Sequence, residues 1–223
     1  MSVSENLHRI KESIPPHVTL VVVSKTQSKE DIMDVYECGQ RIFGENKVQE
    51  LTAKQKELPS DIEWHLLGHL QTNKVKYIAP FISLIHSVDS LKLLKEINAE
   101  AIKNNRTIDC LLEFYIAGEE TKYGLSWEEA REILRSDDFK ELHSVRICGV
   151  MGMASFVDDE TTIRREFETL VKYFIQLKSE FFPGTNCCKE ISMGMSGDYK
   201  IAIEEGSTMV RIGTAIFGER NYL

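Results

Sequence analysis

The chain has 223 residues, of which 42% are apolar, 28% charged and 9% aromatic. This composition is typical of a globular protein with a hydrophobic core and excludes a disordered or fibrous chain. The 35 acidic and 27 basic residues give a formal net charge of −8, which argues against binding to the phosphates of nucleic acid.

The chain has no candidate for a membrane span or a secretion signal. The apolar runs at 18–23 and 210–217 are much shorter than the ~20 residues that cross a bilayer. Residues 1–13 also lack the apolar segment of a signal peptide. We therefore expect a cytoplasmic protein with neither a membrane nor a nucleic-acid partner.

The cysteines are odd in number and form no CxxC pair, so they suggest neither a disulfide framework nor a zinc site. We interpret all five as reduced thiols: Cys38, Cys110, Cys148, Cys187 and Cys188.

Short β-branched or apolar runs alternate along the chain with longer charged, amphipathic stretches, as in βα units around a parallel sheet. A first helix is expected at 3–14. Strands are expected at 19–24, 41–44, 63–68, 84–88, 108–116, 145–151, 190–192 and 209–213. The helices between them are expected at 29–38, 45–58, 71–78, 90–105, 126–134, 159–182 and 197–205.

Eight strands that alternate with helices predict an α/β protein with a single (β/α)8 TIM barrel, preceded by the first helix, as one domain over residues 1–223. An open, doubly wound sheet is the alternative. In a barrel, the functional residues belong at the carboxyl ends of the strands, where the βα loops form the active-site face.

Lys25 follows the first expected strand, which reads Thr-Leu-Val-Val-Val-Ser. An amine at an apolar barrel mouth is desolvated, and desolvation favours the neutral form that attacks an aldehyde as Schiff-base lysines do. Taken alone, Lys25 is equally compatible with a salt bridge or with a solvent-facing ammonium.

Asn46 and Met151 lie at the ends of two further expected strands. Asn46 offers a donor and an acceptor, either as the cap of the following helix or as part of a binding pocket. Met151 is either an ordinary core residue or a flexible thioether that packs against a flat ligand ring.

His65 and His69 are four residues apart, a spacing that suggests a metal pair only on a helix. Here the segment is expected to be a strand followed by a loop. We therefore interpret His65 as a structural histidine and His69 as part of a polar loop.

The last two βα loops contain Ser196, Gly213 and Thr214 at expected helix starts. Unpaired backbone N–H groups at such starts bind anions, and the phosphate site of many TIM barrels is formed after strands seven and eight. The alternative is a set of ordinary turn glycines and caps.

A strand-end lysine and a phosphate cradle on one barrel face describe a site for an aldehyde that carries a phosphate, and pyridoxal phosphate fits this description. Arg211 lies two residues before Gly213, and we expect its guanidinium to face the pyridine nitrogen. Because an arginine stays protonated, that nitrogen must accept a hydrogen bond, which makes the cofactor a weak electron sink.

At these residues the chain resembles the pyridoxal phosphate homeostasis proteins of the YggS/PROSC type, which are related to the barrel domain of alanine racemase. The resemblance covers nearly the whole chain and is weakest over 90–142. It is carried in order by the motifs VVSKT (22–26), FGEN (43–46), WHLLGHLQTNK (64–74), GMSGD (194–198) and STMVRIGTAIFGER (207–220).

The resemblance implies a barrel of fold type III with pyridoxal 5'-phosphate bound covalently to Lys25 as a Schiff base. It further implies that Arg211 meets the pyridine nitrogen and that Asn46 lines the cofactor pocket. The phosphate is then held by Ser196, Gly213 and Thr214.

A racemase needs two positioned acid–base groups. The resemblance implies that alanine racemase takes its second group, a tyrosine, from another subunit and has a further β domain. This sequence ends after the last barrel unit, and Tyr222 is too near its end to replace that tyrosine.

We therefore expect a reversible carrier of the cofactor, with no assigned catalytic residue, little or no turnover, and acceptor apoenzymes as partners. We expect the carrier to be a monomer. An amino-acid racemase of weak or narrow activity is the alternative, and a Schiff-base aldolase would need an acid–base carboxylate near Lys25 that the sequence does not identify.

Overall fold

A parallel barrel organises the chain. The computed structural model describes residues 2–118 and 123–218. In this part of the chain each strand pairs with the next, and β8 pairs with β1 to close the barrel. The strands are β1 (Thr19–Val23), β2 (Ile42–Glu45), β3 (Glu63–Leu66), β4 (Leu84–Val88), β5 (Ile108–Glu113), β6 (Val145–Met151), β7 (Glu190–Ser192) and β8 (Met209–Ile212). The (β/α)8 prediction is confirmed.

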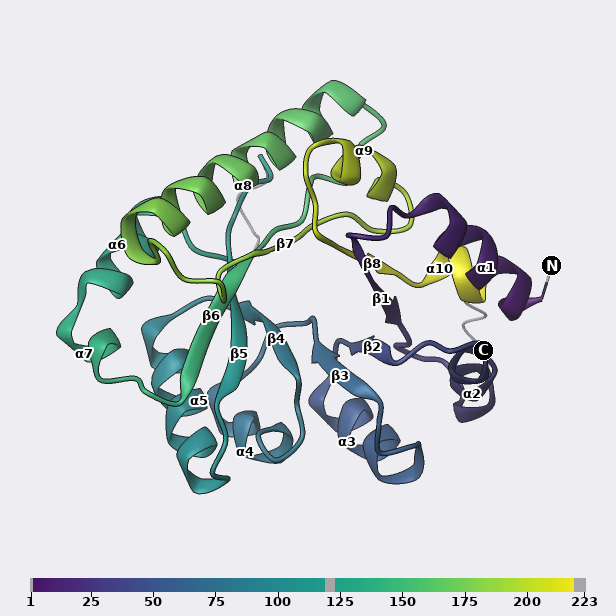
Figure 1. The fold of residues 1–223 in the computed structure, drawn as a ribbon, viewed down its shortest axis with the longest axis horizontal. Helices are drawn as coiled ribbons and strands as arrows, with labels where there is room; N and C mark the ends of the chain where they lie inside the picture. Colours follow the sequence, from purple (N-terminus) through teal and green to yellow (C-terminus); the bar gives the residue numbers. More distant parts are fainter. Residues whose placement is uncertain (1, 119–122, 219–223) are drawn as a thin grey trace.

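The helices surround the barrel (Figure 1). α1 packs beside α10, where the Asn6 side chain donates to the Ile216 carbonyl at 3.0 Å. The helical segments are α1 (Val3–Ser13), α2 (Lys29–Glu37), α3 (Val48–Glu57), η1 (Thr72–Lys74), α4 (Val75–Ile78), α5 (Leu91–Lys103), α6 (Trp127–Arg135), α7 (Asp137–Lys140), α8 (Glu160–Phe181), α9 (Tyr199–Glu204) and α10 (Thr214–Phe217).

Most element boundaries lie within two residues of those expected from the sequence, and two of the exceptions have local causes. β5 ends at Glu113 rather than at 116, since Phe114 pairs only with Leu125 in an isolated bridge. The helix expected at 45–58 begins at Val48, because Glu45 continues strand β2 with its side chain fully buried. The short helix α7 was not expected, and α10 was expected only as a helix start at Gly213 and Thr214, without an end.

Several helices begin where a serine satisfies the first free N–H groups. Ser28 and Ser126 form capping boxes, in which the serine oxygen accepts from the backbone three residues on and an acidic side chain accepts from the serine N–H. These caps determine where α2 and α6 start on the outside of the barrel.

Two apolar clusters separate the inside of the barrel from its outer layer. The larger cluster lies between the strands and the helices and includes Val22, Phe43 and Leu66. The smaller cluster fills the barrel and includes Val21, Leu111 and Met209. Because side chains alternate along a strand, a residue two positions after an inner residue also faces the interior, and this alternation brings polar side chains into the barrel mouth.

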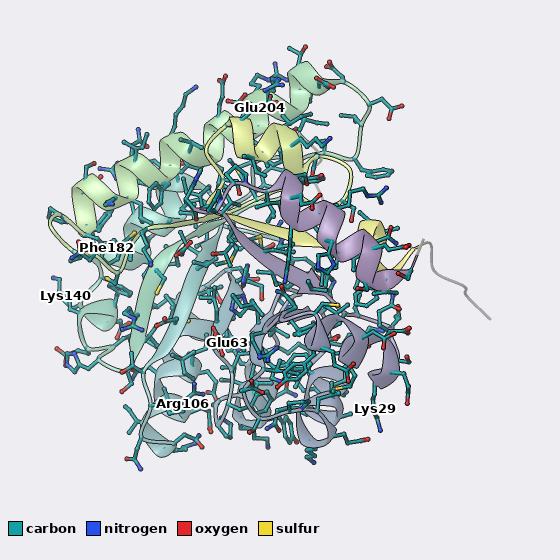
Figure 2. The ribbon with its side chains drawn as sticks, turned by 45° about the vertical axis from the view of Figure 1, so that its right-hand side comes forward. Lys29, Glu63, Arg106, Lys140, Phe182 and Glu204 are labelled. Carbon is teal, nitrogen blue, oxygen red and sulfur yellow. The ribbon has the colours of Figure 1, made fainter. Side chains whose placement is uncertain are left out.

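The outer surface is charged. Lys29 and Lys140 extend from helices on opposite sides of the molecule (Figure 2), with about half or more of each side chain exposed. Within residues 2–118 and 123–218, no helix is both long and apolar enough to cross a membrane.

Candidate functional site

A cavity of about 540 Å³ opens at the carboxyl ends of the strands. Its walls come from the ends of β1, β2, β6 and β8 and from the loops that follow β6, β7 and β8. All seven site residues expected from the sequence line it: Lys25, Asn46, Met151, Ser196, Arg211, Gly213 and Thr214.

Lys25 is half-buried just after β1, and the backbone on both sides of it is held in place. The Ser24 hydroxyl donates to Glu45 Oε1 at 2.6 Å, and the Thr26 N–H donates to Glu50 Oε1 at 2.6 Å. Thr26 has a φ of 65°, a conformation that is costly for a threonine and is found mainly where surrounding contacts enforce it. The strand therefore ends in a fixed turn that directs Lys25.

A buried lysine from α3 joins these two carboxylates. Lys54 Nζ donates to Glu45 Oε1 at 2.8 Å, to Glu50 Oε1 at 2.7 Å and to the Ser24 carbonyl at 2.7 Å. Burial raises the pKa of Glu45, while the charge of Lys54 and its hydrogen bond oppose that rise. We call Glu45, Glu50 and Lys54 the β1 clamp, because together they fix the residues that flank Lys25.

Asn46 lines the cavity and is not a helix cap, so the cap alternative was wrong. Helix α3 begins only at Val48, and Lys47 occupies the capping position without a side-chain hydrogen bond. The adjacent Gly68 lets two loops approach closely, since a Cβ there would lie 2.4 Å from the Asn46 carbonyl oxygen. Asn46 is partly exposed and lines the cavity instead of capping α3.

Ser196 and the turn after β8 form one continuous wall. The Ala215 N–H donates to Ser196 Oγ at 3.3 Å, which joins the loop after β7 to the start of α10. Because Ser196 accepts this bond, its own O–H can donate to a ligand. Gly213 packs against β1, where a Cβ would lie 2.9 Å from the Val23 carbonyl, so a side chain there would push the turn away from Lys25.

Arg211 extends into the cavity from β8 and is only 5% exposed. Its guanidinium donates to Ser192 Oγ at 2.6 Å and to the Gly152 carbonyl at 3.1 Å. Burial lowers the pKa of Arg211 to about 10, against the opposing effect of Asp198 and Glu113. The side chain therefore remains a cation at neutral pH.

Met151 ends β6 in the inner apolar cluster and provides an apolar wall of the cavity. The loop that follows adds an apolar rim in which Phe156 is 98% exposed and Met153 and Val157 are partly exposed. The cavity thus combines an apolar side, which suits a flat ring, with polar groups that can donate hydrogen bonds to a ligand.

His65 and His69 have different environments. His65 is buried on β3, with its Nδ1 3.0 Å from Nε2 of His86, and burial lowers its pKa to about 3. His69 lies in the next loop, 3.1 Å from Asp89. Among the described residues, no three metal-ligating side chains come together to hold a metal ion.

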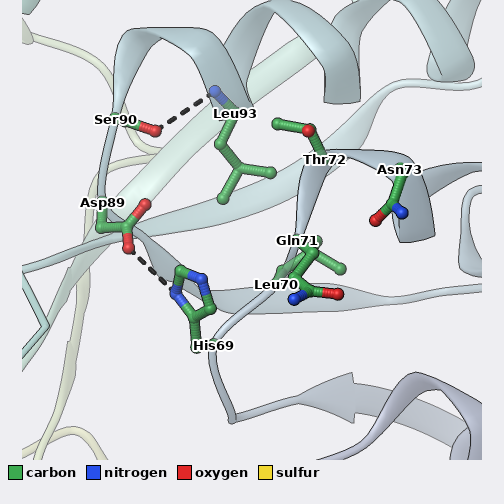
Figure 3. Close-up of a pocket in the computed structure, with 8 residues that line it drawn as sticks. All are labelled: His69, Leu70, Gln71, Thr72, Asn73, Asp89, Ser90 and Leu93. Carbon is green, nitrogen blue, oxygen red and sulfur yellow. Dashed lines mark hydrogen bonds and ion pairs between the residues drawn. The ribbon is translucent and has the colours of Figure 1, made fainter.

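A second cavity, of about 370 Å³, lies between the loops after β3 and β4 (Figure 3). His69, Thr72 and Asp89 line it, and the His69–Asp89 contact crosses one side. It shares no lining residue with the larger cavity. Neither an arginine nor a lysine lines it, so it is less suited to an anionic ligand.

Four buried side chains near the main cavity were not singled out from the sequence: Lys54, His86, Glu113 and Ser192. A polar residue within a short apolar strand indicates a buried hydrogen-bonded group, because a polar group needs a partner when it is buried. This pattern could have identified His86 and Ser192. Lys54 shows no such pattern, since its spacing from Glu50 equally fits a surface pair.

Tyr222, considered above as a second acid–base group, lies outside the described residues.

Barrels with this closed parallel order and a ligand cavity at the strand ends form a class that includes the barrel domain of alanine racemase. The family model for the alanine racemase N-terminal domain matches residues 2–221. The chain is 42% identical over 204 residues to the pyridoxal phosphate homeostasis protein of Aquifex aeolicus, covering 91% of this chain and 87% of that protein. It is 34% identical to the Vibrio alginolyticus protein of the same name, over 99% of both. The chain belongs to the pyridoxal phosphate homeostasis protein family.

Solved structures agree with this assignment. PipY of Synechococcus elongatus, solved with PLP bound, superposes with a TM-score of 0.89 at 34% identity, over 97% of this chain and all of PipY. Alanine racemase of Bartonella henselae superposes with a TM-score of 0.74 at 16% identity and is covered over only 58% of its length. The likeness to the racemase shows a shared barrel fold and nothing about activity.

Proposed function

We propose that this protein binds pyridoxal 5'-phosphate reversibly and serves to store or supply the cofactor. The observation that carries the proposal is the arrangement of the main cavity, where Lys25 at the end of β1 and Ser196, Gly213 and Thr214 after β7 and β8 line the same space. The names of the relatives and the ligand of PipY support it.

The cavity fits this cofactor in size and in chemistry. A volume of about 540 Å³ lies within the usual range for small-ligand pockets. Lys25 would form the covalent bond to the aldehyde, and Ser196, Gly213 and Thr214 would hold the phosphate. Met151 would pack against the ring, Asn46 would line its edge, and Arg211 would donate to the ring nitrogen.

When bound, pyridoxal phosphate supplies an aldehyde and an electron-withdrawing ring. The side chains that we assign to the cavity favour binding of the cofactor over catalysis with it. Arg211 remains protonated, so it donates a hydrogen bond and does not give the ring nitrogen a proton. Among the described residues we assign one acid–base group, Lys25, to the aldehyde, whereas racemisation needs two. We therefore propose a carrier with little or no turnover, and no observation favours the racemase.

The proposal extends to partners and location. Acceptor apoenzymes would receive the cofactor from a monomeric carrier. The five cysteines are all free thiols, as expected in a reducing compartment, which supports the cytosol.

Borohydride trapping tests the central claim. Protein incubated with pyridoxal phosphate should absorb near the visible edge, and reduction should fix the cofactor's mass on the peptide that contains Lys25. Lys25→Ala should abolish the label. Lys200→Ala, which removes an exposed lysine from α9 near the same mouth, should retain it. A label that persists in Lys25→Ala, or that maps to another lysine, would refute the assignment.

A further inference from the structure

Four buried polar side chains form a continuous series of hydrogen bonds across the barrel interior below the main cavity. Arg211 Nη1 lies 2.6 Å from Ser192 Oγ, and Ser192 Oγ lies 3.0 Å from His86 Nδ1. His86 Nε2 lies in turn 3.0 Å from His65 Nδ1. All four residues are at most 5% exposed, and polar groups buried to this degree need hydrogen-bond partners.

The chemistry of the four groups determines the direction of each bond. A guanidinium only donates, so Ser192 Oγ accepts from Arg211. In the described chain, Ser192 Oγ has one further partner, His86 Nδ1. The Ser192 hydroxyl must therefore donate to that nitrogen. His86 then carries its proton on Nε2 and donates to His65 Nδ1, which leaves the His65 proton on Nε2 as well.

The opposite direction is unfavourable. If His86 Nδ1 donated to Ser192, the hydroxyl proton would have no acceptor among the described atoms in a fully buried place, which is costly. A charged His86 would also stand next to the cationic Arg211. Burial lowers the pKa of His86 well below its usual value, and His65 and Arg211 lower it further, which agrees with a neutral His86 ring.

Arg211 depends on this series for its orientation. Its two acceptors are uncharged, Ser192 Oγ and the Gly152 carbonyl. In residues 2–118 and 123–218 no carboxylate forms an ion pair with it; Asp198 and Glu113 act on it only at longer range. The charge of the guanidinium is therefore not neutralised by an adjacent carboxylate and can act on a ligand. Hydrogen bonds to uncharged acceptors fix its orientation.

We infer that Ser192 is a positioning residue that orients Arg211 toward the ligand, and that the neutral His86–His65 pair keeps the Ser192 hydroxyl turned so that it must accept from Arg211. The inference deepens the proposed function and rests on it, because the group toward which Arg211 is oriented is the ring nitrogen of pyridoxal phosphate. The positions of the two histidine protons do not depend on any ligand.

The first experiment uses the ligand-free protein. Nitrogen-15 NMR correlation spectra of the imidazole rings should show His65 and His86 neutral, each with its proton on Nε2, across the neutral pH range. Ser192→Ala removes the donor to His86 Nδ1 and should shift that nitrogen's resonance. A proton on Nδ1 of His86, or a charged ring, would overturn the series whether or not the protein binds the cofactor.

The second experiment compares pyridoxal phosphate with its 1-deaza analogue, which lacks the ring nitrogen. Ser192→Ala should weaken binding of pyridoxal phosphate by roughly tenfold, the effect of a lost charge-assisted hydrogen bond, and leave binding of the analogue unchanged. Ser192→Thr keeps the hydroxyl, so it should bind pyridoxal phosphate and the analogue with the same ratio of affinities as the wild type. Ser207→Ala removes another buried hydroxyl, which donates to β7 and β8 carbonyls and does not contact Arg211, and should leave the ratio of the two affinities unaltered.

The outcomes separate the two proposals. If the wild-type protein binds neither ligand, the proposed function is wrong, and with it the role of Arg211 toward the ring nitrogen. If it binds pyridoxal phosphate but Ser192→Ala weakens both ligands equally or neither, the positioning role of Ser192 is wrong and the proposed function stands.

Discussion

Lys54 reaches from α3 to place its ammonium 2.8 Å from Glu45 Oε1, directly behind the turn that carries Lys25. The lysine side chain is 8% exposed and that of Glu45 is fully buried. A buried pair of this kind adds little net stability, but removal of one partner leaves an uncompensated charge. The β1 clamp therefore makes the geometry at Lys25 sensitive to a residue outside the cavity.

Lys54→Met should lower the free energy of unfolding by about 3 kcal/mol, because it leaves Glu45 buried without its cation. Urea denaturation measures the change. Lys56→Met, at an exposed position on the same helix, should have little effect, and Glu45→Gln added to Lys54→Met should recover part of the loss. Equal stability of Lys54→Met and Lys56→Met would contradict the clamp.

Thr214→Val should weaken binding of pyridoxal phosphate by roughly tenfold, since a hydroxyl donor to a charged phosphate is lost. Unphosphorylated pyridoxal should bind the variant and the wild type equally. Isothermal titration with both ligands measures the difference. Thr72→Val alters a threonine of the second cavity and should change neither affinity. If Thr214→Val lowered the affinity for both ligands equally, Thr214 would not bind the phosphate.

Glu113 should make stability depend on pH. Burial, reinforced by the charge of Asp89, raises its pKa from 4.5 to about 7 in the folded protein, so the folded state retains a proton that the unfolded state releases at lower pH. The stability that Glu113 contributes is complete below about pH 4.5 and is lost as the pH rises through 7.

Glu113→Gln removes this dependence. Relative to the variant, the free energy of unfolding of the wild type should fall by up to about 3 kcal/mol between mildly acidic and mildly alkaline pH. Urea denaturation at a series of pH values measures the difference. Glu63→Gln, at the exposed start of β3 (Figure 2), should follow the wild type at every pH. A constant difference between wild type and Glu113→Gln would show that Glu113 stays charged.

Exchange of α-protons distinguishes carrier from racemase. Protein loaded with pyridoxal phosphate and incubated with alanine or serine in deuterated water should show no exchange over many turnovers, because Lys25 is the single acid–base group assigned near the aldehyde. The same loaded protein should still transfer its cofactor to an acceptor apoenzyme. Proton NMR follows the exchange, and repeated turnover that disappears in Lys25→Ala would establish a racemase.

The positions of the candidate site residues could be predicted because strand ends are local features. A β-branched run followed by Lys25, and another followed by Gly213 and Thr214, predict where each residue lies along its strand, and closure of a barrel brings all strand ends to one face. Asn46 shows the limit of this reasoning. Its place beside a helix suggested a cap, but Glu45 extends β2 and delays the helix to Val48.

The sequence alone determined the fold, the family and seven of the residues that line the main cavity, since the alternation of strands with amphipathic helices and the short ordered motifs can be recognised along the chain. Only the tertiary structure decided which inward-facing groups meet. Ser192 and His86 are 106 residues apart, and Lys54 contacts Ser24 from 30 residues away. Strand alternation tells which side chains face inward, but closure and stagger of the barrel determine which of them lie opposite one another.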